Sequence, residues 1–363
     1  ADMVSMARPF LADPDFVAKA AAGRAAEIAP CIACNQACLD HTFAGKLTTC
    51  LVNPRACHET ELIYAPAAAP KRIAVVGAGP AGLMSAMVAA GRGHSVTLFD
   101  RAAEVGGQLN LAKQVPGKEE FHGLVDWFRA EVARLGITTW LGQTADVRDL
   151  QGFDEVIVAT GVAPRDPGIP GQERALSYID VLRGAPVGKR VAVIGAGGIG
   201  FDVAEFLVAG GHSPTVAPDL WRREWGVGDP STSPGGLADP APEPPARAVW
   251  LLQRKPEKPG RGLGKTTGWI HRAALAAKRV KMLGGCSYDR ISEEGLWITR
   301  DGQPELIPAD TVVLCAGQLP ERGLADRLAA AGIAAHVIGG ADVAAELDAK
   351  RAINQGARLA ASL

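Results

Sequence analysis

Residues 72–83 read Arg-Ile-Ala-Val-Val-Gly-Ala-Gly-Pro-Ala-Gly-Leu, an apolar run that leads into a glycine-rich loop. The apolar run, Ile73–Val76, predicts a short parallel strand that is buried on both faces. The loop then offers Gly77 for a tight turn, Gly79 for close approach to a pyrophosphate, and Gly82 for close packing of a helix on the strand. This stretch therefore predicts the start of a dinucleotide-binding α/β domain.

The residues that follow continue the same pattern. We expect a helix from about Ala81 to Ala90 and a strand over Ser95–Phe99, which ends at Asp100. Asp100 comes 23 residues after Gly77, close to the spacing at which an acid meets ribose hydroxyls. A glycine turn without a ligand is the alternative, and the order strand, helix, strand, acid favours the nucleotide site.

Composition limits the class of protein. A chain of 363 residues is long enough for two or more domains. Charged residues make up 21% and the net charge is −1, so no nucleic acid or anionic membrane partner is expected. No apolar run reaches the roughly 18 residues of a membrane span, and no secretory pattern opens the sequence. We therefore expect a cytoplasmic protein.

The N-terminal residues indicate a fragment of another domain. Ala1–Phe10 is predicted to be a strand from the middle of a domain, and Leu11–Ala22 a short helix with Asp13 and Pro14 as its start signal. We therefore expect these residues to be the end of a larger domain.

Four cysteines follow within twenty residues. Cys31, Cys34, Cys38 and Cys50 have the spacing C-x2-C-x3-C-x11-C. Structural zinc usually uses two separated cysteine pairs, whereas a grouping of three plus one favours a 4Fe–4S cluster. Zinc and a thioredoxin-type redox pair stay as alternatives, and disulfides are not expected without a signal sequence. The other cysteines, expected to be ordinary thiols, are Cys57, Cys286 and Cys315.

A second glycine loop stands at Val191–Gly200, where apolar residues precede Gly195, Gly197 and Gly200, and a helix is expected over Phe201–Ala209. Two loops of this kind imply two dinucleotides.

A strand that runs into a small residue and a glycine occurs twice, at Glu155–Gly161 and at Thr311–Gly317. This recurrence predicts that the chain leaves one domain near Gly161 and returns near Gly317, so that the second domain is nested within the first.

The second loop is predicted to prefer NADPH. Pro214 and Pro218 disfavour a central strand near 215–219, and Trp225–Arg247 is predicted to be an inserted surface loop. The segment that fits a strand best is Ala248–Leu252, which is followed by Gln-Arg-Lys. Arg254 and Lys255 therefore stand where an NAD site would carry an acid. Cations suit a 2′-phosphate, and a solvated basic strand end is the alternative.

The segment Pro259–Arg272 contains Gly-Lys-Thr but lacks the first glycine of a nucleoside-triphosphate phosphate loop, because that position is Pro259. A loop near the nicotinamide, with Lys265 assisting the phosphate, fits better. His271 is expected to be a packed or exposed residue and not a base.

The C-terminal residues are predicted to return to the first domain. His336–Ile338 should form a strand and Ala349–Leu359 a helix. Asp342 could accept hydrogen bonds from a ribityl chain, and the positive end of the helix, near Ile353, could face the electron-rich edge of a flavin.

Taken together, the nested glycine loops, the four-cysteine spacing and the Gly-Lys-Thr-Thr-Gly-Trp segment at 264–269 resemble the bacterial NADPH-dependent 2,4-dienoyl-CoA reductases, relatives of trimethylamine dehydrogenase. The resemblance covers essentially the whole chain. It implies an N-terminal TIM barrel related to old yellow enzyme that carries FMN, then a 4Fe–4S cluster, then an FAD/NADPH module. It also implies that Cys31, Cys34, Cys38 and Cys50 ligate the cluster.

Carried over to this sequence, the resemblance predicts cofactor contacts residue by residue. The FAD positions are Gly77, Gly79, Pro80, Ala81, Gly82, Asp100, Arg101, Gly107, Gln108, Thr160, Gly161, Gly340, Asp342 and Ile353. The NADPH positions are Gly195, Gly197, Gly198, Gly200, Arg254, Lys255 and Lys265. Ala7 and Arg8 resemble the end of the last barrel strand, where an arginine contacts the FMN phosphate.

The expected fold is therefore α/β, with two nested Rossmann-like three-layer domains. The predicted divisions are 1–30 for the last strand and helix of a truncated barrel, 31–70 for the iron–sulfur segment and linker, 71–180 with 305–363 for FAD, and 181–304 for NADPH.

The expected function is the electron-input module of a 2,4-dienoyl-CoA reductase of fatty acid oxidation, whose dienoyl-CoA substrate would bind only to the missing barrel. No catalytic side chain is named. The alternatives are a related enoate reductase, an amine dehydrogenase, or a zinc-bound nucleotide-binding scaffold.

Overall fold

The computed structural model describes residues 2–211, 213–345 and 347–363, and the chain folds into two compact units. The first unit comprises residues 1–110, 120–163 and 318–363, and the second comprises 111–119 and 164–317. The predicted divisions at 180/181 and 304/305 both lie inside the second unit, because the strand Leu176–Ser177 pairs with Thr311–Leu314 there. The chain changes unit close to Gly161 and Gly317.

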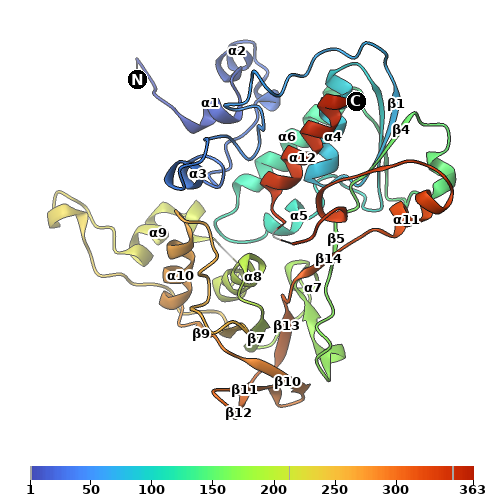
Figure 1. Cartoon of the computed structure of the whole chain (residues 1–363). Coiled ribbons are helices and arrows are strands. Elements are labelled where there is room, and N and C mark those ends of the chain that lie inside the picture. Colours follow the sequence, from blue (N-terminus) through green and yellow to red (C-terminus); the bar gives the residue numbers. More distant parts are fainter. Residues whose placement is uncertain (1, 212, 346) are drawn as a thin grey trace. The chain divides into compact units, whose positions relative to one another are not determined.

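The first unit is built on a five-stranded parallel sheet of order β15-β4-β1-β2-β3 (Figure 1). Its strands are β1 (Arg72–Val76), β2 (Ser95–Asp100), β3 (Thr138–Leu141), β4 (Glu155–Val158) and β15 (His336–Val337). The strands predicted at 73–76, 95–99, 155–159 and 336–338 are confirmed. Each is short, apolar and hydrogen-bonded to parallel neighbours.

Two layers cover this sheet. Ile73 and Val75 of β1 face a core shared with α4 (Pro80–Gly91), α6 (Glu120–Arg134) and α12 (Ala349–Ser362). Ala74 and Val76 face the other side, where η2 (Val147–Leu150), α11 (Gly323–Ala330) and η6 (Gly339–Ala341) supply the core. The alternation follows from the two-residue period of a strand, and it confirms a three-layer α/β unit.

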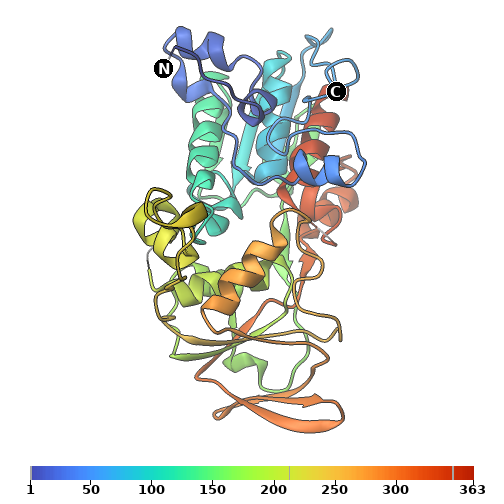
Figure 2. The same ribbon diagram turned by 90° about the vertical axis from the view of Figure 1, so that its left-hand side faces the viewer.

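The N-terminal segment packs on the same unit. It contains α1 (Arg8–Ala12), α2 (Phe16–Ala21), η1 (Ala25–Glu27) and α3 (Leu39–Phe43). Its residues Ala37, Leu51 and Val52 are buried in the core with α6, and Figure 2 shows the segment lying beside that helix. The Trp127 indole of α6 donates a hydrogen bond to the Glu27 carbonyl at 3.2 Å.

The strand predicted at Ala1–Phe10 is wrong, because α1 occupies residues 8–12 and residues 2–7 are in no strand. Pro9 lies at the start of α1, where a proline is pre-shaped for a helix. The helix predicted over 11–22 is interrupted, since buried Asp13 accepts hydrogen bonds from the Asp15 amide, the Ala29 amide and the Lys19 ammonium. A barrel remnant stays a prediction.

The second unit has a five-stranded parallel sheet of order β6-β13-β7-β8-β9 and a separate three-stranded antiparallel sheet, β10-β11-β12 (Figures 1 and 2). The parallel strands are β6 (Leu176–Ser177), β7 (Arg190–Ile194), β8 (Ala248–Leu252), β9 (Lys281–Leu283) and β13 (Thr311–Leu314). The antiparallel strands are β10 (Ser287–Ser292), β11 (Gly295–Arg300) and β12 (Gln303–Pro308).

Helices cover one face of this parallel sheet and the antiparallel sheet covers the other. Val191 and Val193 of β7 pack against α7 (Tyr178–Leu182), α8 (Gly198–Ala209) and α10 (Gly268–Ala277). Ala192 and Ile194 pack against β10–β12. Two further short strands, β5 (Val162–Pro164) and β14 (Gln318–Pro320), pair where the chain changes unit at 163/164 and 317/318. The helix α5 (Leu109–Ala112) spans the change at 110/111.

The segment after α8 has no central strand near 215–219, as its prolines predict. It forms η4 (Pro214–Val216), α9 (Pro218–Trp225) and η5 (Pro234–Gly236). Another short helix of this unit, η3 (Gln172–Arg174), comes earlier in the chain. Beyond α9 the predicted surface loop is confirmed, because the isolated bridge between Val227 and Leu237 is its only strand-like pairing among the described residues. No described helix combines the length and apolarity needed to cross a membrane.

Candidate cofactor-binding sites

The first glycine loop begins where β1 ends. The Gly77 amide donates to the Phe99 carbonyl at 2.8 Å, and its φ of 113° places it in the left-handed region. A Cβ on Gly77 would lie 2.2 Å from the Ala159 carbonyl oxygen, and one on Gly82 would lie 1.8 Å from the Gly77 carbonyl oxygen. A Cβ on Gly79 would meet no atom within 4 Å. Gly77 and Gly82 therefore serve packing, whereas Gly79 leaves open space for a ligand.

The next turn of the chain lies directly over this loop. The Gly106 amide donates to the Ala78 carbonyl at 2.8 Å, and a Cβ on Gly107 would lie 2.8 Å from the Gly79 Cα. Gly107 lies so close to the Gly79 backbone that no side chain fits between them. Gly106 and Gly107 therefore narrow the space beside Gly79. Gln108 follows, and its side-chain oxygen accepts from Gln318 at 3.3 Å.

Asp100 at the end of β2 faces the loop. One carboxylate oxygen accepts from the Ala78 amide at 2.6 Å and the other from the Ala102 amide at 2.7 Å. Its first structural role is therefore to fix the glycine loop. A carboxylate has about four lone-pair sites, so both oxygens keep capacity for ribose hydroxyls. The neighbouring Arg101 is exposed.

Thr160 and Gly161 lie after β4 and are tied to the returning chain. The Thr160 hydroxyl donates to the Glu321 carbonyl at 2.6 Å, and the Glu321 amide donates to the Gly161 carbonyl at 3.0 Å. A Cβ on Gly340 would lie 2.6 Å from Val162 Cγ1. These contacts bring three predicted FAD positions together at the end of β4.

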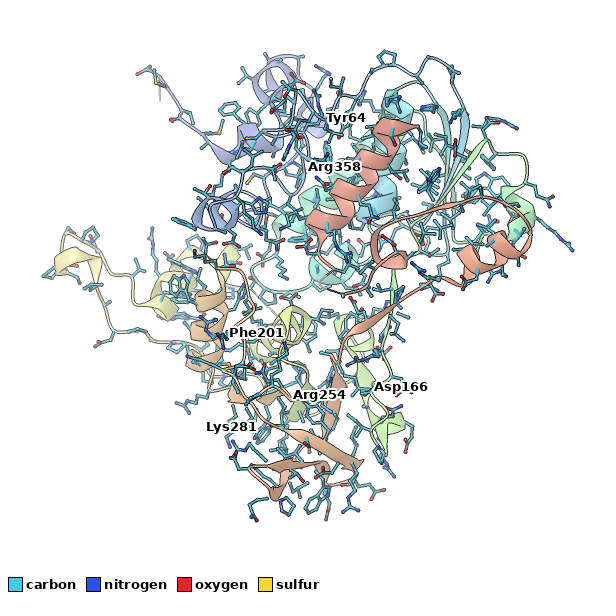
Figure 3. The ribbon with its side chains drawn as sticks, in the orientation of Figure 1. Tyr64, Asp166, Phe201, Arg254, Lys281 and Arg358 are labelled. Atoms are coloured by element: carbon cyan, nitrogen blue, oxygen red, sulfur yellow. The ribbon has the colours of Figure 1, made fainter. Side chains whose placement is uncertain are left out.

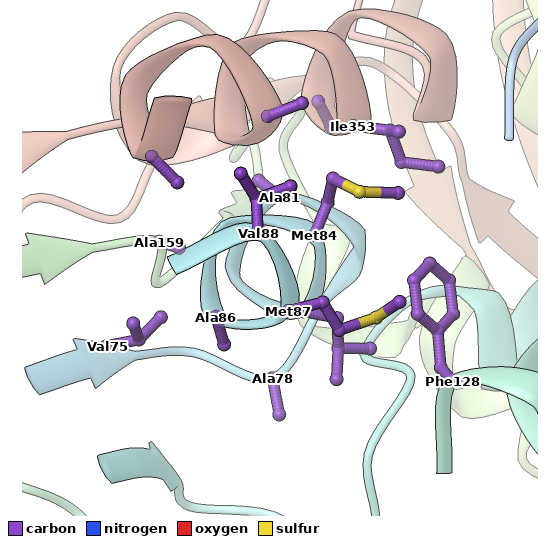
Figure 4. Close-up of a cluster of buried hydrophobic side chains, with 14 of the residues drawn as sticks. Val75, Ala78, Ala81, Met84, Ala86, Met87, Val88, Phe128, Ala159 and Ile353 are labelled. Carbon is purple, nitrogen blue, oxygen red and sulfur yellow. The ribbon is translucent and has the colours of Figure 1, made fainter. Parts of the chain in front are cut away.

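Asp342 is half-buried, whereas Ile353 on the last helix is fully buried. Asp342 accepts from Gln355 Nε2 at 2.9 Å. α12 starts at Ala349 and is capped by Asp348, so Ile353 lies in the second turn. Its side chain is fully buried against α4 (Figure 4). The Ile353 side chain thus packs against α4, and a contact between this part of α12 and a flavin stays a prediction.

The second glycine loop repeats the first in detail. The Gly195 amide donates to the Leu252 carbonyl at 2.8 Å and its φ is 112°. A Cβ on Gly195 would lie 2.3 Å from the Cys315 carbonyl oxygen, and one on Gly200 would lie 1.7 Å from the Gly195 carbonyl oxygen. Added Cβ atoms on Gly197 and Gly198 would meet nothing within 4 Å. Each unit therefore has one loop with the space and the helix N-terminus that a pyrophosphate requires.

A basic turn follows β8. Gln253 Nε2 donates to the Lys255 carbonyl at 3.1 Å and the Glu257 carbonyl at 2.5 Å, so this side chain shapes the turn. The Gly285 amide also donates to the Lys255 carbonyl, at 2.9 Å. Arg254 and Lys255 are both exposed (Figure 3 labels Arg254). After β8 the described chain places Arg254 and Lys255, and not a carboxylate, where an NAD site is acidic.

The glycine-rich segment 259–268 is anchored on α8. A Cβ on Gly260 would lie 2.6 Å from Phe201 Cζ, and Arg272 Nη1 donates to the Gly260 carbonyl at 2.8 Å. Phe201 comes directly after Gly200, so the segment lies beside the second glycine loop. Lys265 is exposed on it.

The sequence analysis did not predict two charged pairs that involve side chains of α8. His271 Nδ1 contacts Glu205 Oε1 at 2.7 Å, and Lys118 contacts Asp202 at 2.6 Å. Burial raises the pKa of Glu205, and the hydrogen bond with Glu205 raises the pKa of His271. Two carboxylates three residues apart on an otherwise apolar helix were the available signal. His271 is packed, as expected.

The four predicted cluster ligands are all half-buried free cysteines. Burial, together with the three nearby thiols, raises the pKa of Cys34 to about 11, and burial also raises the pKa of Cys50. The structure thus brings four soft donors into one neighbourhood, a donor set that suits iron or zinc. In the described ranges, no three or more His, Cys, Asp or Glu side chains are arranged to hold a single metal ion.

Arg8 contacts the cysteine segment. Its Nη1 donates to Asn35 Oδ1 at 2.7 Å, and Asn35 has a φ of 58° directly after Cys34. Ala7 is the residue before α1. Arg8 therefore helps hold a left-handed residue of the cysteine loop, a contact that the sequence did not indicate.

The two glycine loops, one in each unit, define an oxidoreductase with FAD-type and NAD(P)-type nucleotide folds. The chain belongs to the pyridine nucleotide-disulphide oxidoreductase family, which it matches over residues 71–351. It is 33% identical over 342 residues to a metal reductase of Desulforamulus reducens, covering 89% of this chain and 49% of that protein. It is also 33% identical over 223 residues to a cinnamate reductase of Clostridium sporogenes, covering 59% and 33%.

A solved structure has a similar fold. A 2-naphthoyl-CoA reductase in complex with 2-naphthoyl-CoA superposes with a TM-score of 0.85 at 26% identity, covering all of this chain and 50% of that one. The chain spans half or less of the length of these relatives. It is thus an oxidoreductase module of the pyridine nucleotide-disulphide type, with one FAD-type and one NAD(P)-type nucleotide fold.

Proposed function

We propose that the chain is the electron-input module of a larger reductase, in which electrons pass from NADPH through FAD and a 4Fe–4S cluster to FMN. One observation carries this proposal: two glycine loops with the same backbone contacts occur in a chain that also packs four cysteines on its first unit. Nicotinamide delivers two electrons together, a cluster accepts one, and FAD converts between them.

The chain's own residues bind and orient and do not act as acids or bases. Gly79 leaves room for the FAD pyrophosphate, and Asp100 holds that loop while keeping acceptor sites for ribose. Arg254 and Lys255, presented by Gln253, would bind the 2′-phosphate of NADPH. Lys265 would assist a phosphate from the adjacent loop.

The cysteine spacing favours a cluster over zinc. Three cysteines fall within eight residues and Cys50 follows alone, whereas structural zinc usually takes two separated cysteine pairs. Burial and the three neighbouring thiols together raise the pKa of Cys34, so the four side chains lie in one neighbourhood.

For the whole protein we propose reduction of a 2,4-dienoyl-CoA in fatty acid metabolism, at a barrel that this chain does not contain. The structural likeness to a 2-naphthoyl-CoA reductase supports an unsaturated acyl-CoA substrate. The likeness to a cinnamate reductase supports an enoate reductase as the second candidate. Arg8 would contact the FMN phosphate with the guanidinium donors that its hydrogen bond to Asn35 leaves. A cytoplasmic location is part of the proposal.

The test is an anaerobic visible spectrum of the FAD-loaded chain during titration with NADPH, with NADH as the control. We expect NADPH to bleach the flavin at lower concentration. Arg254→Gln should weaken NADPH binding about tenfold and leave NADH unchanged, whereas Arg183→Gln, an exposed arginine elsewhere in the second unit, should change neither. Equal use of both nucleotides by the unaltered chain would contradict the NADPH assignment.

The cluster is tested by iron and acid-labile sulfide content. Cys38→Ser should abolish both, while Cys57→Ser, an exposed cysteine outside the spacing, should retain them. Zinc without sulfide in the unaltered chain would instead support the scaffold alternative.

A further inference from the structure

A groove of about 1000 Å³ lies within the first unit, away from the glycine loop. Its walls are the cysteine segment between His41 and His58, the edge strand β15, and the side of α12 that faces away from α4. Among its lining residues only Asp342 is also a predicted FAD position. The groove is therefore largely separate from the FAD site.

Cations dominate its lining. Lys350, Arg351 and Arg358 all project from α12 into it, and Figure 3 labels Arg358 on that helix. Arg351 Nη2 donates to the Val343 carbonyl at 2.6 Å, and Arg358 Nε donates to Asn354 Oδ1 at 2.9 Å. Within the described ranges no carboxylate is bonded to either guanidinium. The partners that the described residues supply to both guanidiniums are neutral oxygens.

The one lining carboxylate does not neutralise these groups. Asp342 already accepts from Gln355 at 2.9 Å and lies 3.5 Å from Arg322, which is outside the groove lining. Lys350 reaches Asp348 only at 4.0 Å. Its ammonium is 3.4 Å from His41 Nε2, and since His41 Nδ1 contacts the Leu47 carbonyl at 2.9 Å, Nε2 is the ring's acceptor for Lys350.

Lys350, Arg351 and Arg358 together offer several charged donors along one side of α12. A phosphate supplies several acceptor oxygens on one small group, so its chemistry suits these donors.

We propose that this groove binds a phosphorylated small molecule of nucleotide size, with its phosphate on Lys350, Arg351 and Arg358. The volume lies at the upper end of ordinary small-molecule sites, far larger than a lone phosphate needs. Ile338 and Leu359 supply apolar lining for the rest of the molecule.

The test is calorimetric titration of the full chain, saturated with FAD and NADP⁺ so that both dinucleotide sites are filled. AMP is the probe, with adenosine and inorganic phosphate as comparisons. We expect saturable AMP binding and none for adenosine, because the phosphate supplies the contacts. Phosphate that binds as tightly as AMP would contradict a ligand of nucleotide size, because the rest of the molecule would then contribute nothing.

Lys350→Gln and Arg358→Gln should each weaken AMP binding about tenfold or more, since each removes a charged hydrogen-bond donor. Arg148→Gln, an exposed arginine of the same unit outside the groove, should have no effect.

FAD content and NADPH bleaching are recorded for every variant, so failure of this site is distinguishable from failure of the electron-input function. No saturable AMP or phosphate binding at millimolar concentration would overturn the proposal, as would equal affinity in Lys350→Gln, Arg358→Gln and the unaltered chain.

Discussion

Two glycines three residues apart in the first loop should respond oppositely to the same substitution. Gly82→Ala places a methyl 1.8 Å from the Gly77 carbonyl oxygen, and that oxygen belongs to a backbone that cannot move aside freely. Overpacking of this kind costs about 1–3 kcal/mol, and backbone contact favours the upper end. In a unit of about 200 residues this lowers Tm by about 6–12 °C.

Gly79→Ala should leave the fold nearly intact. The added methyl meets no atom within 4 Å, and the φ of −81° suits alanine. Gly79 is the N-cap of α4, where alanine costs about 1 kcal/mol or less, so Tm falls by about 2–4 °C at most. The methyl instead occupies the space of the ligand. Loss of one charged hydrogen bond to a pyrophosphate weakens FAD binding about tenfold or more.

The assay compares thermal unfolding of the FAD-free variants with their FAD affinity by fluorescence quenching. Gly79→Ala should separate the two readouts, with stability kept and affinity lost. The reasoning is refuted if Gly79→Ala binds FAD as tightly as the unaltered chain, or if it destabilises the FAD-free protein as much as Gly82→Ala.

Two further predictions concern packing and pH. Gly356→Ala should lower Tm by several degrees, because its Cβ would lie 2.3 Å from the Ala81 carbonyl oxygen between α12 and α4. Gly123→Ala in α6 should raise Tm slightly by improving helix propensity, because a Cβ there meets nothing within 4 Å. Equal shifts of Tm in thermal unfolding would contradict this prediction. The hydrogen bond with Glu205 raises the pKa of His271, so the folded state holds the imidazole proton more tightly than the unfolded chain does. This stabilisation is complete below the ordinary histidine pKa and is lost as pH rises through the raised value. Urea unfolding from pH 6 to 9 should therefore show a steeper fall in stability for the unaltered chain than for His271→Gln, and parallel curves would contradict the assignment.

Much of the fold could be predicted because its signals are local. An apolar run such as Ile73–Val76 needs only its own composition to favour a buried strand, and a loop such as Gly195–Gly200 needs glycines wherever a Cβ would strike backbone. Both loops, their strands and the helices after them lie where the sequence predicts.

Other features were predicted incorrectly or missed because they depend on distant residues. The residues 8–12 form a helix since Pro9 and buried Asp13 organise that turn, although the composition resembled a strand. Ile353 is buried by α4, a contact that no pattern around residue 353 indicates.

The nucleotide-binding character of both units follows from the sequence, because the glycines, strands and helix starts that create it lie within a few residues of one another. The charged pairs and the groove arise only in the folded chain. Lys118 meets Asp202 across 84 residues and His41 meets Lys350 across 309, and in the first unit the cations of α12 become a site only when the cysteine segment packs beside them. Such contacts depend on how separate elements pack, and packing is settled by the whole hydrophobic core and not by any local pattern.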